Sequence, residues 1–256
     1  MEKSIDSPTR WINVVAFIIM VIVNGLAGST TLIGGKNTAE VSDAYPTLVT
    51  PAGYVFAIWG IIYILLGIFA YYQTTSGQKV KEYRNRIGWL FALSCAANVT
   101  WLFLWQFEYL TVSVAVMFVL LASLILIYLR LDIGKSAATI REKIAFHLPF
   151  SVYLGWITIA TIANISVALV SAGWNGFGVN PQTWASVVVI VALIITLLVL
   201  ASRRDVAYSL VIIWALIGIS VNQSANQLIV LLTQVSAAIV AIAIVVVTLI
   251  PRLRKR

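Results

Sequence analysis

Aromatic and amide side chains recur at helical spacing in three segments, and they are the residues whose chemistry could serve a function. Each set has members at positions i, i+3 and i+7, and the third set adds i+11. At about 100° per residue, such positions stay within a stripe of the helix about 60° wide. The sets are Phe56, Trp59 and Tyr63; Asn98, Trp101 and Trp105; and Tyr153, Trp156, Ala160 and Asn164.

These stripes combine flat apolar rings with a few polar atoms. Buried indole N–H, phenol and amide groups need hydrogen-bond partners. If the three stripes converge, they form a deep aromatic cavity with a few polar groups, which suits a flat and mostly apolar ligand. The alternative is that the stripes only pack helices together, with asparagines forming interhelical hydrogen bonds. The stripes alone leave both interpretations open.

The remaining reactive side chains are few. Cys95 is the only cysteine, and its small neighbours favour close helix packing over a reactive thiol. His147 is the only histidine, which excludes a clustered His/Cys metal site, and its place near a segment end favours a satisfied or interfacial side chain. Every lysine lies in a tail, a loop or a segment end, which argues against a retinal Schiff base. We therefore expect no enzymatic activity.

The elements that must position these side chains are membrane-spanning helices. Of 256 residues, 61% are hydrophobic and 10% are charged, whereas soluble domains carry about 25% charged residues. This composition excludes a soluble enzyme and a disordered chain. A spanning helix needs about 20 mostly apolar residues, and we expect eight of them in an all-α polytopic membrane helix bundle. They run roughly over Trp11–Ile33, Pro51–Gln73, Arg86–Phe107, Thr111–Ile133, Ile144–Ser171, Trp184–Ser202, Val206–Val221 and Ala225–Ile250.

The net charge of +8 indicates how the protein is oriented in the membrane and does not indicate nucleic-acid binding. All basic residues except Lys36 fall in the tails and in alternate loops, on one side of the predicted bundle. By the positive-inside rule this side is cytoplasmic, which places both termini there and requires an even number of spans. A cleavable signal peptide ending near Leu26–Ser29 is the alternative, and it would leave seven spans. The longest outer loop, about Gly34–Thr50, could cover a site from outside.

The aromatic stripes also lie within longer motifs. Residues 51–59 read PAGYVFAIW and are followed by Tyr63, and residues 97–101 read ANVTW. Residues 153–156 read YLGW, with Ala160 and Asn164 following. In order and spacing these motifs resemble helices 2, 3 and 5 of the TspO/translocator protein family, the tryptophan-rich sensory proteins related to the peripheral-type benzodiazepine receptor.

The resemblance implies a TspO-like five-helix membrane core over residues 1–171. Residues 172–256 then supply three additional transmembrane helices and a basic cytoplasmic tail. The chain departs from the family pattern where helix 2 lacks a proline between Phe56 and Trp59, and Trp105 stands where a phenylalanine is usual. The sterol-type pattern of animal members is absent after helix 5.

The family implies binding of a tetrapyrrole such as protoporphyrin or haem, with no required cofactor. We expect an integral membrane protein of the bacterial plasma membrane whose partners are lipids and a hydrophobic ligand. A homodimer through small residues near Cys95 stays open. The alternative function is a small-solute transporter or channel, motivated by the short segment 206–221 and the polar break Asn222–Gln227. The candidate ligand-binding residues are Tyr54, Phe56, Trp59, Tyr63, Asn98, Trp101, Trp105, Tyr153, Trp156 and Asn164.

Overall fold

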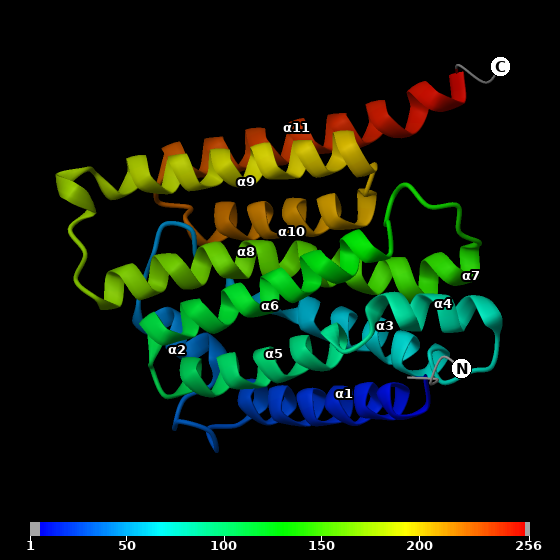
Figure 1. Ribbon diagram of the computed structural model, residues 1–256. Coiled ribbons are helices and arrows are strands. Elements are labelled where there is room, and N and C mark those ends of the chain that lie inside the picture. Colours follow the sequence, from blue (N-terminus) through cyan, green and yellow to red (C-terminus); the bar gives the residue numbers. More distant parts are fainter. Residues whose placement is uncertain (1–5, 254–256) are drawn as a thin grey trace.

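The computed structural model describes residues 6–253, and over this range the chain forms helices and no strand (Figure 1). The prediction of an all-α bundle is confirmed. The first part contains α1 (Asp6–Ser29), α2 (Thr38–Ala44), η1 (Gly53–Ala57), α3 (Ile58–Tyr72), α4 (Gln78–Ile87), α5 (Leu90–Gln106), α6 (Leu110–Arg130), α7 (Ile140–Glu142), η2 (Lys143–His147) and α8 (Leu148–Ser171). The second part contains η3 (Gly176–Gly178), α9 (Pro181–Arg203), α10 (Val206–Asn222) and α11 (Gln227–Leu253).

The long helices run back and forth along one axis (Figure 1). The short helix α2 lies at one end of the bundle, and α4 and α7 lie at the other, where α1 begins and α11 ends. We call these the α2 end and the α7 end. Helix α8 packs against α3, α6 and α10, while α9 and α11 pack on the far side of α10. The most buried long helix is therefore also the one that carries the third aromatic stripe.

Six of the described helices are long and apolar enough to cross a membrane, or seven if α4 and α5 count as one bent span. Helix α10 is apolar but has only 17 residues. All eight predicted segments are helical, and the protein is an integral membrane helix bundle. The number of spans stays a prediction.

The predicted segment Arg86–Phe107 is wrong as a single helix. Arg86 and Ile87 belong to α4, which meets α5 at a bend of 47°. The break occurs at Gly88, whose φ of +54° lies in the left-handed region that glycine adopts without steric cost. Lys79, Lys81, Arg84 and Arg86, which the sequence places in a loop on the basic side, are therefore all helical.

The segment Pro51–Gln73 begins differently from the prediction as well. Its first turn is the 3₁₀ helix η1, and the α-helix starts at Ile58. Residues of α10 fasten this region: the Ala52 N–H donates to the Gly218 carbonyl at 3.0 Å, and Trp214 Nε1 donates to the Val55 carbonyl at 3.1 Å. A side chain at Gly218 would overlap Val55. Helix α10 and η1 are therefore in close contact.

Candidate functional site

A cavity lies between η1, α3, α5 and α8, and α2 covers it. The cavity holds about 40 Å³ of space that a water molecule can reach, within a partly open hollow of about 480 Å³. Its wall is almost entirely apolar. The lining residues are Thr38, Ser42, Pro51, Phe56, Trp59, Trp101, Trp105, Trp156, Ile159, Ala160, Ala163, Asn164 and Val167.

Trp156 is the most deeply placed aromatic residue of this wall, with 2% of its surface exposed. The rings of Phe56 and Trp59 meet it edge to face, with ring centroids 5.8 and 6.1 Å away. Its indole Nε1 is buried and has no hydrogen-bond partner. An unpaired buried donor is costly, so an acceptor brought within reach of this N–H would be stabilised.

Trp101 is held in place by Asn164, a residue of the third aromatic stripe. Its Nε1 donates to Asn164 Oδ1 at 2.9 Å, and Asn164 Nδ2 donates to Ser113 Oγ on α6 at 2.9 Å. This chain of bonds joins α5, α6 and α8 beside the cavity. The polar atoms of Asn164 therefore orient the aromatic wall.

Trp105 links the wall to the cover. Its ring stacks on Trp101 with centroids 5.5 Å apart, and its Nε1 donates to the Thr38 carbonyl at 3.1 Å. Thr38 is the first residue of α2, and α2 begins with a capping box between Asn37 and Glu40. The loop that contains α2 thus covers the cavity, as the sequence suggested, and its place on the outer side of the membrane stays a prediction.

A charged cluster anchors the two ends of the cover. Lys36 Nζ donates to Glu108 Oε1 at 2.6 Å, and the Tyr45 hydroxyl donates to Glu108 Oε2 at 2.6 Å. The hydrogen bond from Lys36, followed by that from Tyr45, holds the pKa of Glu108 below its usual value. The same contact raises the pKa of Lys36. Lys36 and Glu108 are therefore ionised at neutral pH, while the hydrogen bond to Glu108 raises the pKa of Tyr45 and keeps its hydroxyl protonated.

The structure brings six of the ten candidate residues to the cavity and places four elsewhere. Tyr63 stacks on the Trp59 ring with centroids 5.6 Å apart, behind the wall. Asn98 Nδ2 donates to the Tyr153 hydroxyl at 3.1 Å, and both side chains are buried. Tyr54 is half exposed and meets Trp214 edge to face. Three of these four support the wall from behind, and Tyr54 faces α10.

Sequence reasoning missed the small and aliphatic part of the lining. Ile159, Ala163 and Val167 carry no polar or aromatic signal, although they lie near Trp156 and Asn164 on the same helix. Thr38 and Ser42 were missed because the outer loop was not assigned a helix. The spacing of Asn37 and Glu40 is a capping-box signal that predicts this helix.

The polar break after α10 has a structural role. Asn222 Nδ2 donates to the Thr50 carbonyl at 3.0 Å, and Gln223 Nε2 donates to the Thr47 carbonyl at 3.1 Å. These bonds attach the end of α10 to the loop that leads into η1. The side-chain amides of Asn222 and Gln223, which belong to the polar break that motivated the transporter alternative, thus form hydrogen bonds within the protein.

Comparison with known proteins gives one family match. The model of the family described as TSPO-like protein matches residues 10–250. The match includes α9, α10 and most of α11, so it extends beyond the five segments that carry the sequence motifs. No curated protein and no solved structure matches the chain.

Proposed function

Because the chain belongs to the TSPO-like protein family, we propose that it binds a flat, apolar ligand of the tetrapyrrole class in the cavity under α2. The observation that carries the proposal is the buried, unpaired Trp156 N–H in an aromatic wall. An acceptor atom at the edge of a tetrapyrrole would pair with this donor. The rings of Trp59 and Trp101 would contact the ligand face.

Binding requires the cover to open. The space wide enough for a water molecule is about 40 Å³, which is far below what a tetrapyrrole occupies. The transmembrane helices that form the wall pack against neighbours along their length, whereas α2 has seven residues. Helix α2 is therefore the part of the lining that can move at the smallest cost.

The proposed role is binding, without a chemical step and without a required cofactor. The wall has a single amide, Asn164, and its oxygen already accepts the Trp101 N–H. The proposed location is the plasma membrane of a bacterium with both termini cytoplasmic, so α2 and the cavity that it covers lie toward the outer side. The charge pattern supports this orientation.

Titration of the purified full-length protein with protoporphyrin tests the proposal. Saturable quenching of tryptophan fluorescence gives the dissociation constant from its midpoint. Trp156→Phe keeps an aromatic ring but removes the N–H, so the dissociation constant should rise roughly five- to tenfold. Trp89→Phe is the matched control, because Trp89 lies exposed at the break between α4 and α5.

Two results would contradict the proposal. One is quenching that does not saturate, and the other is an equal dissociation constant in both variants. A Soret-region absorbance band in the protein as purified would identify the ligand class directly. Protoporphyrin flux into protein-containing vesicles would instead favour the transporter alternative.

A further inference from the structure

The connection between α8 and α9, residues 172–180, lies at the α2 end of the bundle (Figure 1), and we call it the α8–α9 loop. Its residue Phe177 has 82% of its surface exposed, the largest fraction of any large hydrophobic residue in the described part of the chain. The φ of Phe177 is +54°, in the left-handed region that bulky residues rarely adopt. An exposed ring held in a strained conformation indicates a function for this loop beyond packing.

Neighbouring side chains hold the α8–α9 loop in this conformation. Asn175 Oδ1 accepts the Phe177 N–H at 3.0 Å, and Trp184 of α9 donates from Nε1 to the Gly176 carbonyl at 2.9 Å. The Trp174 ring meets those of Phe177 and Trp184, with ring centroids 5.5 and 5.2 Å away. A side chain at Gly176 would lie 3.1 Å from Trp184 Nε1. The loop is therefore a preformed unit that presents Phe177 at its surface.

The α8–α9 loop carries no charge. No Asp, Glu, Lys or Arg occurs between Lys143 and Arg203. The loop that contains α2, at the same end of the bundle, carries Lys36, Glu40 and Asp43. Tryptophan is enriched at the membrane–water interface, and Trp and Phe side chains enter the boundary between lipid head groups and acyl chains. The composition of the α8–α9 loop thus fits the lipid boundary.

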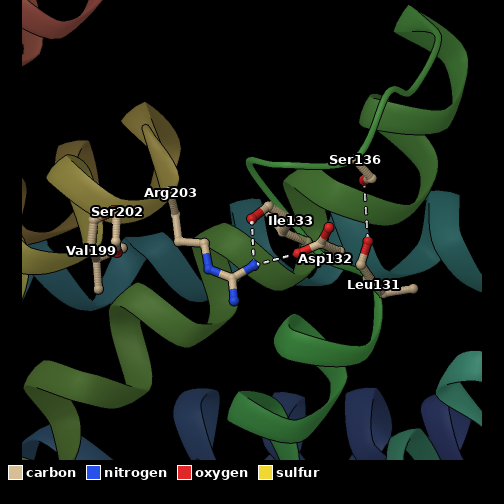
Figure 2. A network of polar contacts seen from close by, with 7 residues as sticks. All are labelled: Leu131, Asp132, Ile133, Ser136, Val199, Ser202 and Arg203. Carbon is tan, nitrogen blue, oxygen red and sulfur yellow. Dashed lines mark hydrogen bonds and ion pairs between the residues drawn. The ribbon is translucent and has the colours of Figure 1, made fainter.

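The length of α9 places this loop at the edge of a bilayer. Figure 2 shows Arg203, at the end of α9, bonded to Asp132 Oδ1 at 2.7 Å and to the Ile133 carbonyl at 3.4 Å. These charged groups mark the edge of the hydrocarbon at the α7 end. Helix α9 has 23 residues and is about 34 Å long at 1.5 Å per residue, against about 30 Å for the hydrocarbon core. Its first residue, Pro181, thus lies at the opposite edge, and Phe177 lies close to it.

We propose that the α8–α9 loop is a preformed membrane anchor, whose partner is the lipid leaflet at the α2 end. The Phe177 ring enters the boundary between head groups and acyl chains, with Trp174 beside it. Because the loop is uncharged, its insertion does not require anionic lipid. The anchor fixes the depth at which α9 begins. It does not involve the cavity and does not depend on ligand binding.

A fluorescent label on the loop measures its depth. Cys95 is the only native cysteine and is buried, so Val179→Cys can be labelled selectively with a nitrobenzoxadiazole dye. The full-length protein is placed in phosphatidylcholine nanodiscs, which leave both faces open to water. Nitroxides near the start of the acyl chains should quench the label several-fold more than aqueous iodide does, and added phosphatidylglycerol should not change this ratio. A label quenched mainly by iodide, or a ratio that requires the anionic lipid, overturns the proposal.

Phe177→Asn in the labelled protein isolates the contribution of the ring. Asparagine adopts the left-handed region more readily than phenylalanine, so the backbone conformation is retained while the ring is lost. The ratio of nitroxide to iodide quenching should fall several-fold. Leu32→Asn is the matched control, because Leu32 is 78% exposed in a different loop at the same end, and the ratio should not change. Equal ratios with and without the Phe177 ring overturn the proposal.

Glycine variants test whether the anchor is preformed. Gly176→Ala brings a methyl group against the Trp184 indole, so it should lower the quenching ratio although Phe177 is retained. Gly178→Ala is the matched control, because Gly178 also has a positive φ, of +76°, but open space around it. Gly178→Ala should lower the ratio less than Gly176→Ala. Equal ratios in the two variants overturn a preformed anchor, and this arm keeps the test decisive if Phe177→Asn does not fold.

Discussion

At the scale of single residues, the asparagines decide whether the aromatic wall is rigid. Asn98 and Asn164 were both predicted as polar tips of the stripes, and the structure gives them different partners. Asn98 accepts from Asn24 Nδ2 at 2.7 Å and donates to Tyr153, whereas Asn164 binds Trp101 and Ser113. Sequence periodicity identified their face of the helix, but it could not identify partners on helices 50 or more residues away.

The Asn164 network gives a stability prediction. Asn164→Leu keeps the volume but leaves the Trp101 N–H buried without its acceptor, while the Ser113 hydroxyl loses Asn164 and keeps only its bond to the Leu110 carbonyl. The free energy of unfolding should fall by about 1–2 kcal/mol. Thermal or denaturant unfolding in detergent measures this change. Ser186→Ala is the control, because Ser186 is only partly buried and bonds within its own helix; equal stability of the two variants would refute the assigned role.

At the scale of elements, apolar runs predicted helices well and their ends poorly. All eight predicted segments are helical, because a run of about 20 apolar residues has few alternatives in a membrane. The errors fall where a local feature overrides hydropathy. Gly88 divides α4 from α5, and η1 replaces the first turn of α3 because its backbone and side chains meet α10. The 3₁₀ geometry of η1 depends on the contact between Val55 and Trp214, which are 159 residues apart in the sequence, and no local pattern encodes such a contact.

The cover α2 gives a prediction about pH and access. Since the folded-state pKa of Glu108 is lowered, its bonds to Lys36 and Tyr45 stabilise the closed cover above the ordinary carboxyl pKa. This stabilisation is lost as the pH falls through the lowered folded-state value. Glu108→Gln should therefore open the cover at neutral pH and raise the association rate of protoporphyrin severalfold, as stopped-flow quenching measures.

Asp43→Asn is the control for that variant, because it removes one exposed negative charge from α2 itself. An equal acceleration in both variants would mean that net charge, rather than the Glu108 cluster, sets the rate. At acidic pH, protoporphyrin should associate with the wild type as fast as it associates with Glu108→Gln at neutral pH. A rate independent of pH would contradict the role of the carboxylate.

At the scale of the whole molecule, the structure attaches α9–α11 through the packing of α10 on α8 and through contacts at the two ends of the bundle. One is the α7 end, where Arg203 meets the residues after α6, and the other is the α2 end, where α10 meets η1. The sequence showed three additional apolar segments but carried no signal for their attachment points. The sequence shows Gly134 and Gly218 but does not reveal their role. Each packs against a segment that is distant in the sequence and is brought near only by folding.

Gly134 tests the attachment at the α7 end. Its φ is +84°, and a side chain there would overlap the Arg203 carbonyl. Gly134→Ala should lower the free energy of unfolding by roughly 1–3 kcal/mol and increase hydrogen exchange in α9. Gly173→Ala is matched, with a φ of +67° and open space around it, so it should show backbone strain alone. Equal losses in the two variants would exclude the overlap as the cause.

The contact between η1 and α10 has a consequence for how ligand occupancy is communicated. Phe56 and Pro51 belong to the cavity wall, while Val55, one residue away, is bonded to Trp214 and packed on Gly218. A ligand that displaces the wall at Phe56 must also displace α10. By thermodynamic linkage, an effector that binds better to the displaced α10 would raise ligand affinity by the factor by which the ligand raises the affinity of the effector. Helix α10 runs from Val206 to Asn222, and the contact is made by Trp214 and Gly218 in its second half. A single helix of 17 residues thus extends from the α7 end to the cavity wall, so a displacement of the wall by the proposed ligand would be transmitted along α10.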